Sequence, residues 1–339
     1  MARRLEASRS KRTALPPTYE SDGRDSDLPR SGIALTTGVS MIHIKPALRV
    51  CTLALLPICL GMAGCSEEQV TSSVADESST TMISGFSGPE SVRYDPELDV
   101  FFVSNFNGEP SGDSNGFVSK VSADGQIVDL EFMVGSAETP FHGGRGMFID
   151  GPYLWVVDAG GVHRFLRETG EHSGFVDFSA FELGFLNDIV LAGDGNLYVT
   201  DTGTAKLYRV SDGIVTLAAD VPISPNGVTL NPANGRLILV PWEGSVEFFE
   251  WDISDQSFTS LGLAPDGGNY DGVEVFNGAV ITASQTDTSL HVMVDGIDRR
   301  ELALPGRPAD IGIDTKRQRV AIPYVSLNRV DIISLGDFE

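Results

Sequence analysis

The sequence predicts an all-β protein, a six-bladed β-propeller of four-stranded antiparallel blades whose last blade is closed by an N-terminal strand. From residue 84 onward no segment sustains a helical period, whereas short alternating apolar runs separated by Gly, Asp, Asn and Pro recur to the end. These runs group into units of about 35 residues, near the length of a propeller blade. The sixth unit shows only three strands of its own, so a strand from elsewhere has to complete it.

The clearest unit consists of four apolar runs with Asp-Gly turns between them. An Asp-Gly pair between two alternating runs is a strong hairpin signal, because Gly accepts the positive φ that the turn needs. The four strands are expected at 188–191, 197–200, 206–210 and 214–218, with turns at Asp194-Gly195 and Asp212-Gly213.

The other units repeat this design in order along the chain. Their strands are expected at 91–94, 100–104, 116–121 and 126–132; 147–149, 153–157, 161–165 and 174–178; 228–230, 236–240, 246–251 and 258–261; 273–276, 279–283, 290–294 and 299–304; and 311–313, 319–323 and 329–335. Residues 80–85 supply the missing strand of the last unit. A ring closed in this way leaves only short, protected strand edges.

The first 65 residues are expected to precede the folded domain. Residues 1–40 are polar, show no apolar period and are interpreted as an upstream extension that is untranslated or disordered. Residues 41–65 contain a basic start and an apolar run, as in a signal peptide, and the run is too short to span a membrane. Residues 66–82 are polar and acidic and are expected to form a flexible tether, which leaves 83–339 for the propeller.

The signal peptide ends in Gly-Met-Ala-Gly-Cys at residues 61–65, which resembles a bacterial lipoprotein signal. The resemblance implies lipidation of Cys65 and export to the periplasm or cell surface, with the membrane contacted only through the lipid. Met62 departs from the Leu usual at its position. Cleavage of an ordinary signal peptide is the alternative.

Cysteine content and charge limit the chemistry of the exported part. All three cysteines lie within the first 65 residues, so the folded domain has neither a disulfide nor a thiol nucleophile. The whole chain has a net charge of −23; nine basic and five acidic residues precede residue 66, which leaves 15 basic and 42 acidic residues, a charge of −27. Nucleic acid is excluded as a partner by such a charge, whereas cations are favoured. Adaptation to salt would explain the acidity equally well.

A distinctive residue stands at the start of each unit, where propeller blades face the central channel. The set is Glu90, Arg145, Asn187, Asn226, Asp271 and Asp310. Four of them, Glu90, Asn187, Asn226 and Asp271, form a hard oxygen donor set of low net charge. Such a set suits Ca²⁺, or another divalent metal of the same kind, whereas Zn²⁺ would favour His or Cys.

A turn-forming role is the alternative for the Asn and Asp residues of this set. Asp194-Gly195 and Asn234-Gly235 lie between strands, as hairpin turns should, whereas the residues at unit starts lie where no turn requires Asn or Asp. The metal reading is therefore preferred for the set. Arg145 and Asp310 could instead pair with each other or with solvent, or Arg145 could hold an anionic group of a substrate.

The chain is similar to the SMP-30/gluconolactonase/LRE-like six-bladed propellers over residues 85–336. Glu90 with Tyr94 and Asp95-Pro96, Asn187-Asp188, Pro225-Asn226-Gly227 and Asp271-Gly272 carry the resemblance. It implies that Glu90, Asn226 and Asp271 hold a divalent metal, typically Ca²⁺, and that Asn187 lines the same site beside the substrate. The sequence departs from the family at Ser91-Val92, where Gly-Pro is usual, and its segment from His142 to Arg145 matches no family motif.

The resemblance implies a hydrolase acting on a small molecule, a lactone or a sugar-derived compound, with Asp271 as the base that activates water. No nucleophile-elbow segment predicts a Ser/His/Asp triad. Two alternatives stay open. One is a non-catalytic binding or scaffold module with a structural channel metal, and the other is a metal-dependent lyase like virginiamycin B lyase, with His142 transferring a proton. His142 is also a candidate substrate-binding residue, together with Asn187 and Arg145.

Overall fold

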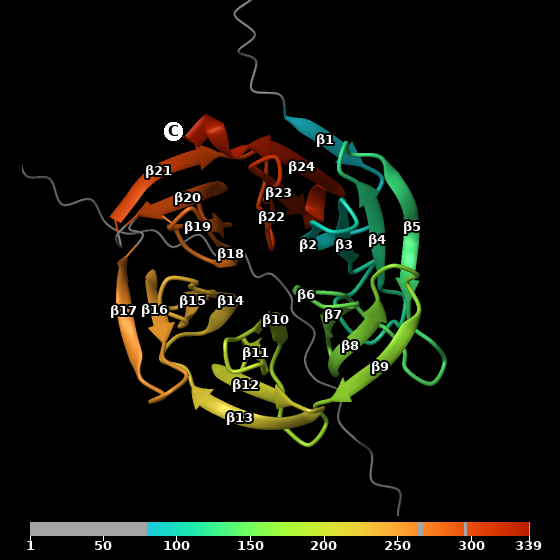
Figure 1. Cartoon of the computed structure of the whole chain (residues 1–339), viewed down its shortest axis with the longest axis horizontal. Helices are drawn as coiled ribbons and strands as arrows, with labels where there is room; N and C mark the ends of the chain where they lie inside the picture. Colours follow the sequence, from blue (N-terminus) through green and yellow to red (C-terminus); the bar gives the residue numbers. More distant parts are fainter. Residues whose placement is uncertain (1–79, 264–266, 295–296, 339) are drawn as a thin grey trace, which may run out of the picture. The chain divides into compact units, whose positions relative to one another are not determined.

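The computed structural model describes residues 80–263, 267–294 and 297–338. In these residues the chain forms six four-stranded antiparallel sheets arranged as a ring (Figure 1). The all-β class and the six-bladed propeller are thus confirmed. The expected extension, signal peptide, lipidation site and all but the end of the tether lie outside the described residues.

Blades 1 to 3 each use four consecutive strands, ordered from the channel outward (Figure 1). Blade 1 consists of β2 (Pro89–Asp95), β3 (Val100–Asn105), β4 (Phe117–Ser122) and β5 (Ile127–Val134). Blade 2 consists of β6 (Met147–Asp150), β7 (Tyr153–Asp158), β8 (Gly161–Leu166) and β9 (His172–Asp177). Blade 3 consists of β10 (Leu186–Leu191), β11 (Leu197–Asp201), β12 (Lys206–Ser211) and β13 (Ile214–Asp220).

Blades 4 and 5 follow the same order, and blade 6 ends on the N-terminal strand. Blade 4 consists of β14 (Pro225–Leu230), β15 (Leu237–Pro241), β16 (Glu247–Trp251) and β17 (Phe258–Leu263). Blade 5 consists of β18 (Tyr270–Phe276), β19 (Ala279–Ser284), β20 (Ser289–Val294) and β21 (Ile297–Ala303). Blade 6 consists of β22 (Gly312–Asp314), β23 (Arg319–Tyr324), β24 (Arg329–Ser334) and β1 (Thr81–Ser84).

Helical structure in the described residues is limited to two short 3₁₀ segments, η1 (Val325–Leu327) and η2 (Leu335–Phe338). Neither these nor any other described segment is a helix of the length and hydropathy needed to cross a bilayer.

The ring closes where β1 pairs antiparallel with β24, with Thr81 opposite Ile332 and Ser84 opposite Arg329. This is the closing strand expected at residues 80–85. It begins at Thr81, inside the segment 66–82 assigned to the tether, because the chain enters the sheet as soon as an apolar residue can be buried. Ile83 is 6% exposed, whereas its neighbour Met82 is 65% exposed.

The hydrophobic core lies between neighbouring blades rather than at the centre of the ring. Ile83 of blade 6 packs with Val92 and Phe101 of blade 1 in one cluster. Tyr198 of blade 3 packs edge-on against Trp251 of blade 4, with ring centroids 5.4 Å apart. Each interface buries apolar faces of two sheets, so every blade depends on both neighbours.

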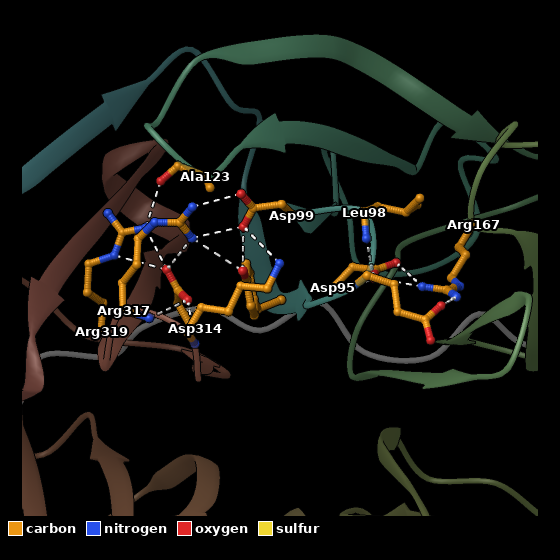
Figure 2. A network of polar contacts seen from close by, with 11 residues as sticks. Asp95, Leu98, Asp99, Ala123, Arg167, Asp314, Arg317 and Arg319 are labelled. Carbon is orange, nitrogen blue, oxygen red and sulfur yellow. Dashed lines mark hydrogen bonds and ion pairs between the residues drawn. The ribbon is translucent and has the colours of Figure 1, made fainter.

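A polar network at the C-terminal end of β2 adds to the ring closure (Figure 2). Asp95 is the last residue of β2, and its carboxylate accepts a hydrogen bond from the backbone N–H of Leu98 at 3.0 Å. The same carboxylate accepts one from the guanidinium of Arg167 in blade 2 at 2.7 Å. The carboxylate of Asp99, in the next turn, accepts a hydrogen bond from the guanidinium of Arg317 in blade 6 at 2.7 Å. These charge-assisted bonds tie blade 1 to both of its neighbours.

The closing strand is expected to contribute to stability mainly through its inward side chain. Ile83→Ala should lower the free energy of unfolding by about 2–4 kcal/mol, because it removes buried methyl groups from the cluster between blades 1 and 6. Met82→Ala, one position away on the exposed face, should change it by less than about 0.5 kcal/mol. Urea unfolding followed by circular dichroism measures both. Equal losses in the two variants would show that the burial of β1 is not what closes the ring.

Candidate functional site

The four candidate metal ligands all lie in β-bulges of inner strands. Pairing with the second strand shifts register between Pro89 and Ser91, Leu186 and Ile189, Pro225 and Val228, and Tyr270 and Val273. These intervals hold Glu90, Asn187, Asn226 and Asp271. Bulges re-aim side chains and are common beside active sites. The inner strands of blades 1, 3, 4 and 5 therefore begin two or three residues earlier than expected, because the candidate ligands belong to the strands themselves.

Blades 2 and 6 lack this feature. The pairs β6–β7 and β22–β23 run in continuous register, and Arg145 and Asp310 precede their strands. Backbone pairing nevertheless continues before β6, where the Arg145 N–H donates to the Val157 carbonyl at 2.9 Å. Arg145 and Asp310 do not pair with each other: Asp310 accepts the Ser91 hydroxyl at 2.5 Å, and Arg145 bonds to backbone carbonyls.

The glycines that follow the bulge residues permit close approach of neighbouring blades. A Cβ atom at Gly227 would lie 2.2 Å from the carbonyl oxygen of Asp271, and one at Gly272 would lie 2.3 Å from the backbone nitrogen of Ile311. Neither glycine has a positive φ. Gly195, in contrast, has φ +79° in a hairpin turn. The Asn-Gly and Asp-Gly pairs at the channel are therefore not turns, and their glycines are needed for space.

All four side chains line one cavity of about 480 Å³, a size suited to a small molecule. Each is between 2% and 5% exposed. Three of them carry a buried oxygen with no hydrogen-bond partner: Glu90 Oε2, Asn226 Oδ1 and Asp271 Oδ1. Buried polar atoms are normally paired, so three orphaned oxygens at one place indicate a missing electropositive partner.

The electrostatics of the cavity floor, which Glu90, Asn187, Asn226 and Asp271 form, also favour an electropositive partner. Burial raises the pKa of Glu90, and the nearby carboxyl groups of Asp271 and Asp310 raise it further. Burial also raises the pKa of Asp271, as does Asp310, while hydrogen bonds from Gln285 and Asn226 act against this. Ionising these two carboxyl groups is costly in the protein alone and becomes favourable beside a cation.

The donor set has an unusual composition for a protein metal site. No group of three or more His, Cys, Asp or Glu side chains placed to hold a metal occurs in the described part of the chain. The cavity floor instead combines two carboxylates with two amides. Such oxygen donors fit Ca²⁺, which accepts amide oxygens and completes its shell with water.

The cavity walls come from two recurring positions that the sequence analysis did not identify. Residues that directly follow the second strand of a blade form most of the wall: Phe106, Thr202, Gly203, Trp242, Glu243, Gln285 and Val325. Phe185 and Ser224 precede inner strands and complete it. The signal available in the sequence was the repeat register itself, because the position after each second strand can be counted from the hairpin turns.

The last residue of a second strand fixes the loop that leads into its blade. Asn105 accepts the backbone N–H of Ser87 at 3.0 Å, and Asp201 accepts that of Phe185 at 2.7 Å. Ser284 accepts the N–H of Gly268 at 3.1 Å. The cavity rim is thereby held by side chains that recur from blade to blade.

Arg145 and His142, predicted as substrate-binding residues, do not line this cavity. The Arg145 guanidinium is buried, donates to the carbonyls of Leu186 and Pro110, and lies 3.6 Å from the ring centroid of Phe185. His142 borders a separate hollow of about 370 Å³, and its Nδ1 lies 3.2 Å from the Ser114 hydroxyl. Among the described residues, no histidine lines the cavity that holds the four candidate ligands.

Comparison with known proteins identifies the fold. The sequence matches no protein-family model, and no curated protein is significantly similar to it. A gluconolactonase from Xanthomonas campestris superposes with a TM-score of 0.60 at 20% identity, over 75% of this chain and 89% of its own. Regucalcin from Agrobacterium tumefaciens, a calcium-binding protein, gives 0.58 at 16% identity, over 74% and 90%.

Virginiamycin B lyase from Staphylococcus aureus superposes with a TM-score of 0.52 at 12% identity, over 76% of this chain and 99% of its own. At such identities these comparisons show a shared fold. The expected SMP-30/gluconolactonase family fits that fold, without a sequence match to confirm membership.

The close approach at Gly227 should be sensitive to a single methyl group. Gly227→Ala should lower the free energy of unfolding by about 1–3 kcal/mol, because the new Cβ displaces the Asp271 backbone. Gly193→Ala, where the added Cβ meets no atom within 4 Å, is the matched control and should change stability by less than about 0.5 kcal/mol. Thermal and urea unfolding measure both. A neutral Gly227→Ala would contradict the tight contact between β14 and β18.

Proposed function

We propose that the protein is an exported, lipid-anchored, Ca²⁺-dependent hydrolase of a lactone or related cyclic ester. One observation carries this proposal: three orphaned, buried oxygens, from Glu90, Asn226 and Asp271, border one cavity of small-molecule size. The likeness in fold to a gluconolactonase and to a calcium-binding regucalcin supports it.

Glu90, Asn226 and Asp271 would hold the metal, and Asn187 would complete the set or contact the substrate. Bound there, Ca²⁺ supplies a Lewis acid for the lactone carbonyl oxygen. Gln285 Nε2 donates to Asp271 Oδ2 at 2.8 Å, which fixes the carboxylate and leaves Oδ1 for the cavity. The Asn187 side chain, which has a donor as well as an acceptor, can orient the ester.

Asp271 is the residue placed to take a proton from water. Its carboxylate would accept the proton as the water oxygen bonds to the lactone carbonyl carbon. The ring carbon–oxygen bond then breaks, and Asp271 returns the proton to the departing alkoxide, so that lactone plus water yields one hydroxy acid. Without a cation, burial raises the pKa of Asp271; a bound cation would lower it again, so that the carboxylate is ionised and able to accept the proton.

The metal requirement can be tested on the full chain after chelation. We expect calorimetry to show one tight Ca²⁺ site, with the Kd raised at least about 100-fold in the Asn226→Ala/Asp271→Ala double variant, because direct ligands matter at least as much as their supporting residues. Lactone hydrolysis should require Ca²⁺ and be lost in Asp271→Ala.

The control is the double variant Asp194→Ala/Asn234→Ala, which changes Asx-Gly turns outside the cavity and should bind Ca²⁺ like the wild type. Hydrolysis without Ca²⁺ that persists in Asp271→Ala would overturn the proposal. An unsaturated product in place of a hydroxy acid would indicate a lyase, and Ca²⁺ binding without turnover would indicate a scaffold.

The location of the protein follows from the lipoprotein-like signal. Expressed in a bacterial host, the full chain should incorporate labelled fatty acid and partition with membranes. Cys65→Ala should abolish the label, whereas Cys59→Ala, within the apolar run, should not. Equal labelling of the two variants, or none in the wild type, would replace lipid anchoring by simple secretion.

A further inference from the structure

We infer that the cavity takes an uncharged lactone with an aromatic or apolar body rather than a polyhydroxylated sugar lactone. This inference rests on the proposed hydrolase function and names its substrate class. It comes from what the walls above the metal-ligand candidates are made of and from how their polar groups are already used.

The walls present large apolar surfaces to the ligand. Phe106, Phe185, Trp242 and Val325 line the cavity from blades 1, 3, 4 and 6 and are each partly exposed to it. Aromatic side chains contribute large contact areas and bind flat or apolar groups well. Because these four come from different blades, apolar surface surrounds the cavity on several sides.

Three of the four polar side chains of the wall are committed to the protein, and Glu243 is the exception. The Thr202 hydroxyl donates to the carbonyl of Pro225 at 2.8 Å, and the Ser224 hydroxyl donates to that of Thr202 at 2.6 Å. The Gln285 amide donates to Asp271 at 2.8 Å. A sugar lactone carries several hydroxyl groups that lose water on entry, and this wall gives few of them a new partner.

No positive charge is available for an anionic substrate. Among the described residues that line the cavity there is no Lys or Arg, and Glu243 is exposed at it. The nearest candidate, Arg145, lies behind Phe185 and uses its guanidinium on two backbone carbonyls and the Phe185 ring. Arg145 thus holds a wall residue in place, and the substrate meets the ring instead of the charge.

The test compares two substrates on the Ca²⁺-loaded full chain. Dihydrocoumarin is an aryl-fused lactone, and glucono-δ-lactone is its polyhydroxylated counterpart. We expect kcat/KM for dihydrocoumarin to be at least about tenfold higher, since a site that pairs substrate hydroxyls would show the opposite order. Phe185→Leu and Trp242→Leu should raise KM for dihydrocoumarin about fivefold or more and leave kcat nearly unchanged.

Two aromatic residues outside the cavity provide matched controls. Phe181→Leu, four residues before Phe185, and Trp155→Leu, in blade 2, should leave KM for dihydrocoumarin within about twofold of the wild type. The wild-type comparison needs no variant, so a variant that fails to fold does not remove the test. Equal or greater kcat/KM for glucono-δ-lactone would overturn the inference while the hydrolase function stands.

Failure to hydrolyse either lactone would instead overturn the hydrolase function. The substrate class is then decided by binding of the non-hydrolysable lactams, dihydroquinolinone and gluconolactam, measured by calorimetry. Tighter binding of dihydroquinolinone, lost in Trp242→Leu and kept in Trp155→Leu, would support the apolar site. Preference for gluconolactam, or no binding of dihydroquinolinone, would overturn it.

Discussion

Six inner strands share one channel, and their backbones approach more closely than side chains allow. Gly146, Gly227, Gly272 and Gly312 each leave less than 2.5 Å between a would-be Cβ and an atom of the next blade. This packing fixes how the blades meet. Gly227 and Gly272 lie within β-bulges of their strands. The Asn187 carbonyl accepts the N–H of Gly146 from the neighbouring blade. Backbone contact around the channel is therefore the constraint on which the site depends.

The same bulges concentrate oxygen atoms at one end of the channel. Each places an Asn, Asp or Glu side chain in the cavity. A neighbouring blade donates a hydrogen bond to the backbone carbonyl of Glu90, Asn187 and Asn226. The arrangement is unfavourable without a cation, because Glu90 and Asp271 are buried together and their pKa values rise. A stable ring thus carries a destabilised pair of carboxylates, which is common where a bound group supplies the compensation. At the opposite end of β2, Asp95 is equally buried but is compensated by Arg167 (Figure 2).

Equivalent positions in different blades have the same role in the cavity. Inner-strand bulges form the cavity floor, residues after the second strands form the wall, and the last residue of a second strand holds the entry loop. A repeat architecture can change its ligand by substitution at the apolar wall positions, because Phe106, Phe185, Trp242 and Val325 lie outside the hydrophobic clusters that join the blades. That separation explains how the fold supports a lactonase, a calcium-binding protein and a lyase among the solved structures it resembles.

The sequence alone determined the class, the number of blades, the closing strand and the four polar positions at the channel. Hairpin turns and period-two patterns are local signals, and a repeat multiplies them, so residues such as Asp194-Gly195 and Asn234-Gly235 suffice to locate strands. Only the tertiary structure decided that Asn187, Asn226 and Asp271 lie within strands as bulges, because a register shift depends on the paired strand and not on the residues themselves. It also decided that Arg145 is covered by Phe185 and that Trp242 lines the cavity, since side chains from different blades meet only when the ring is closed.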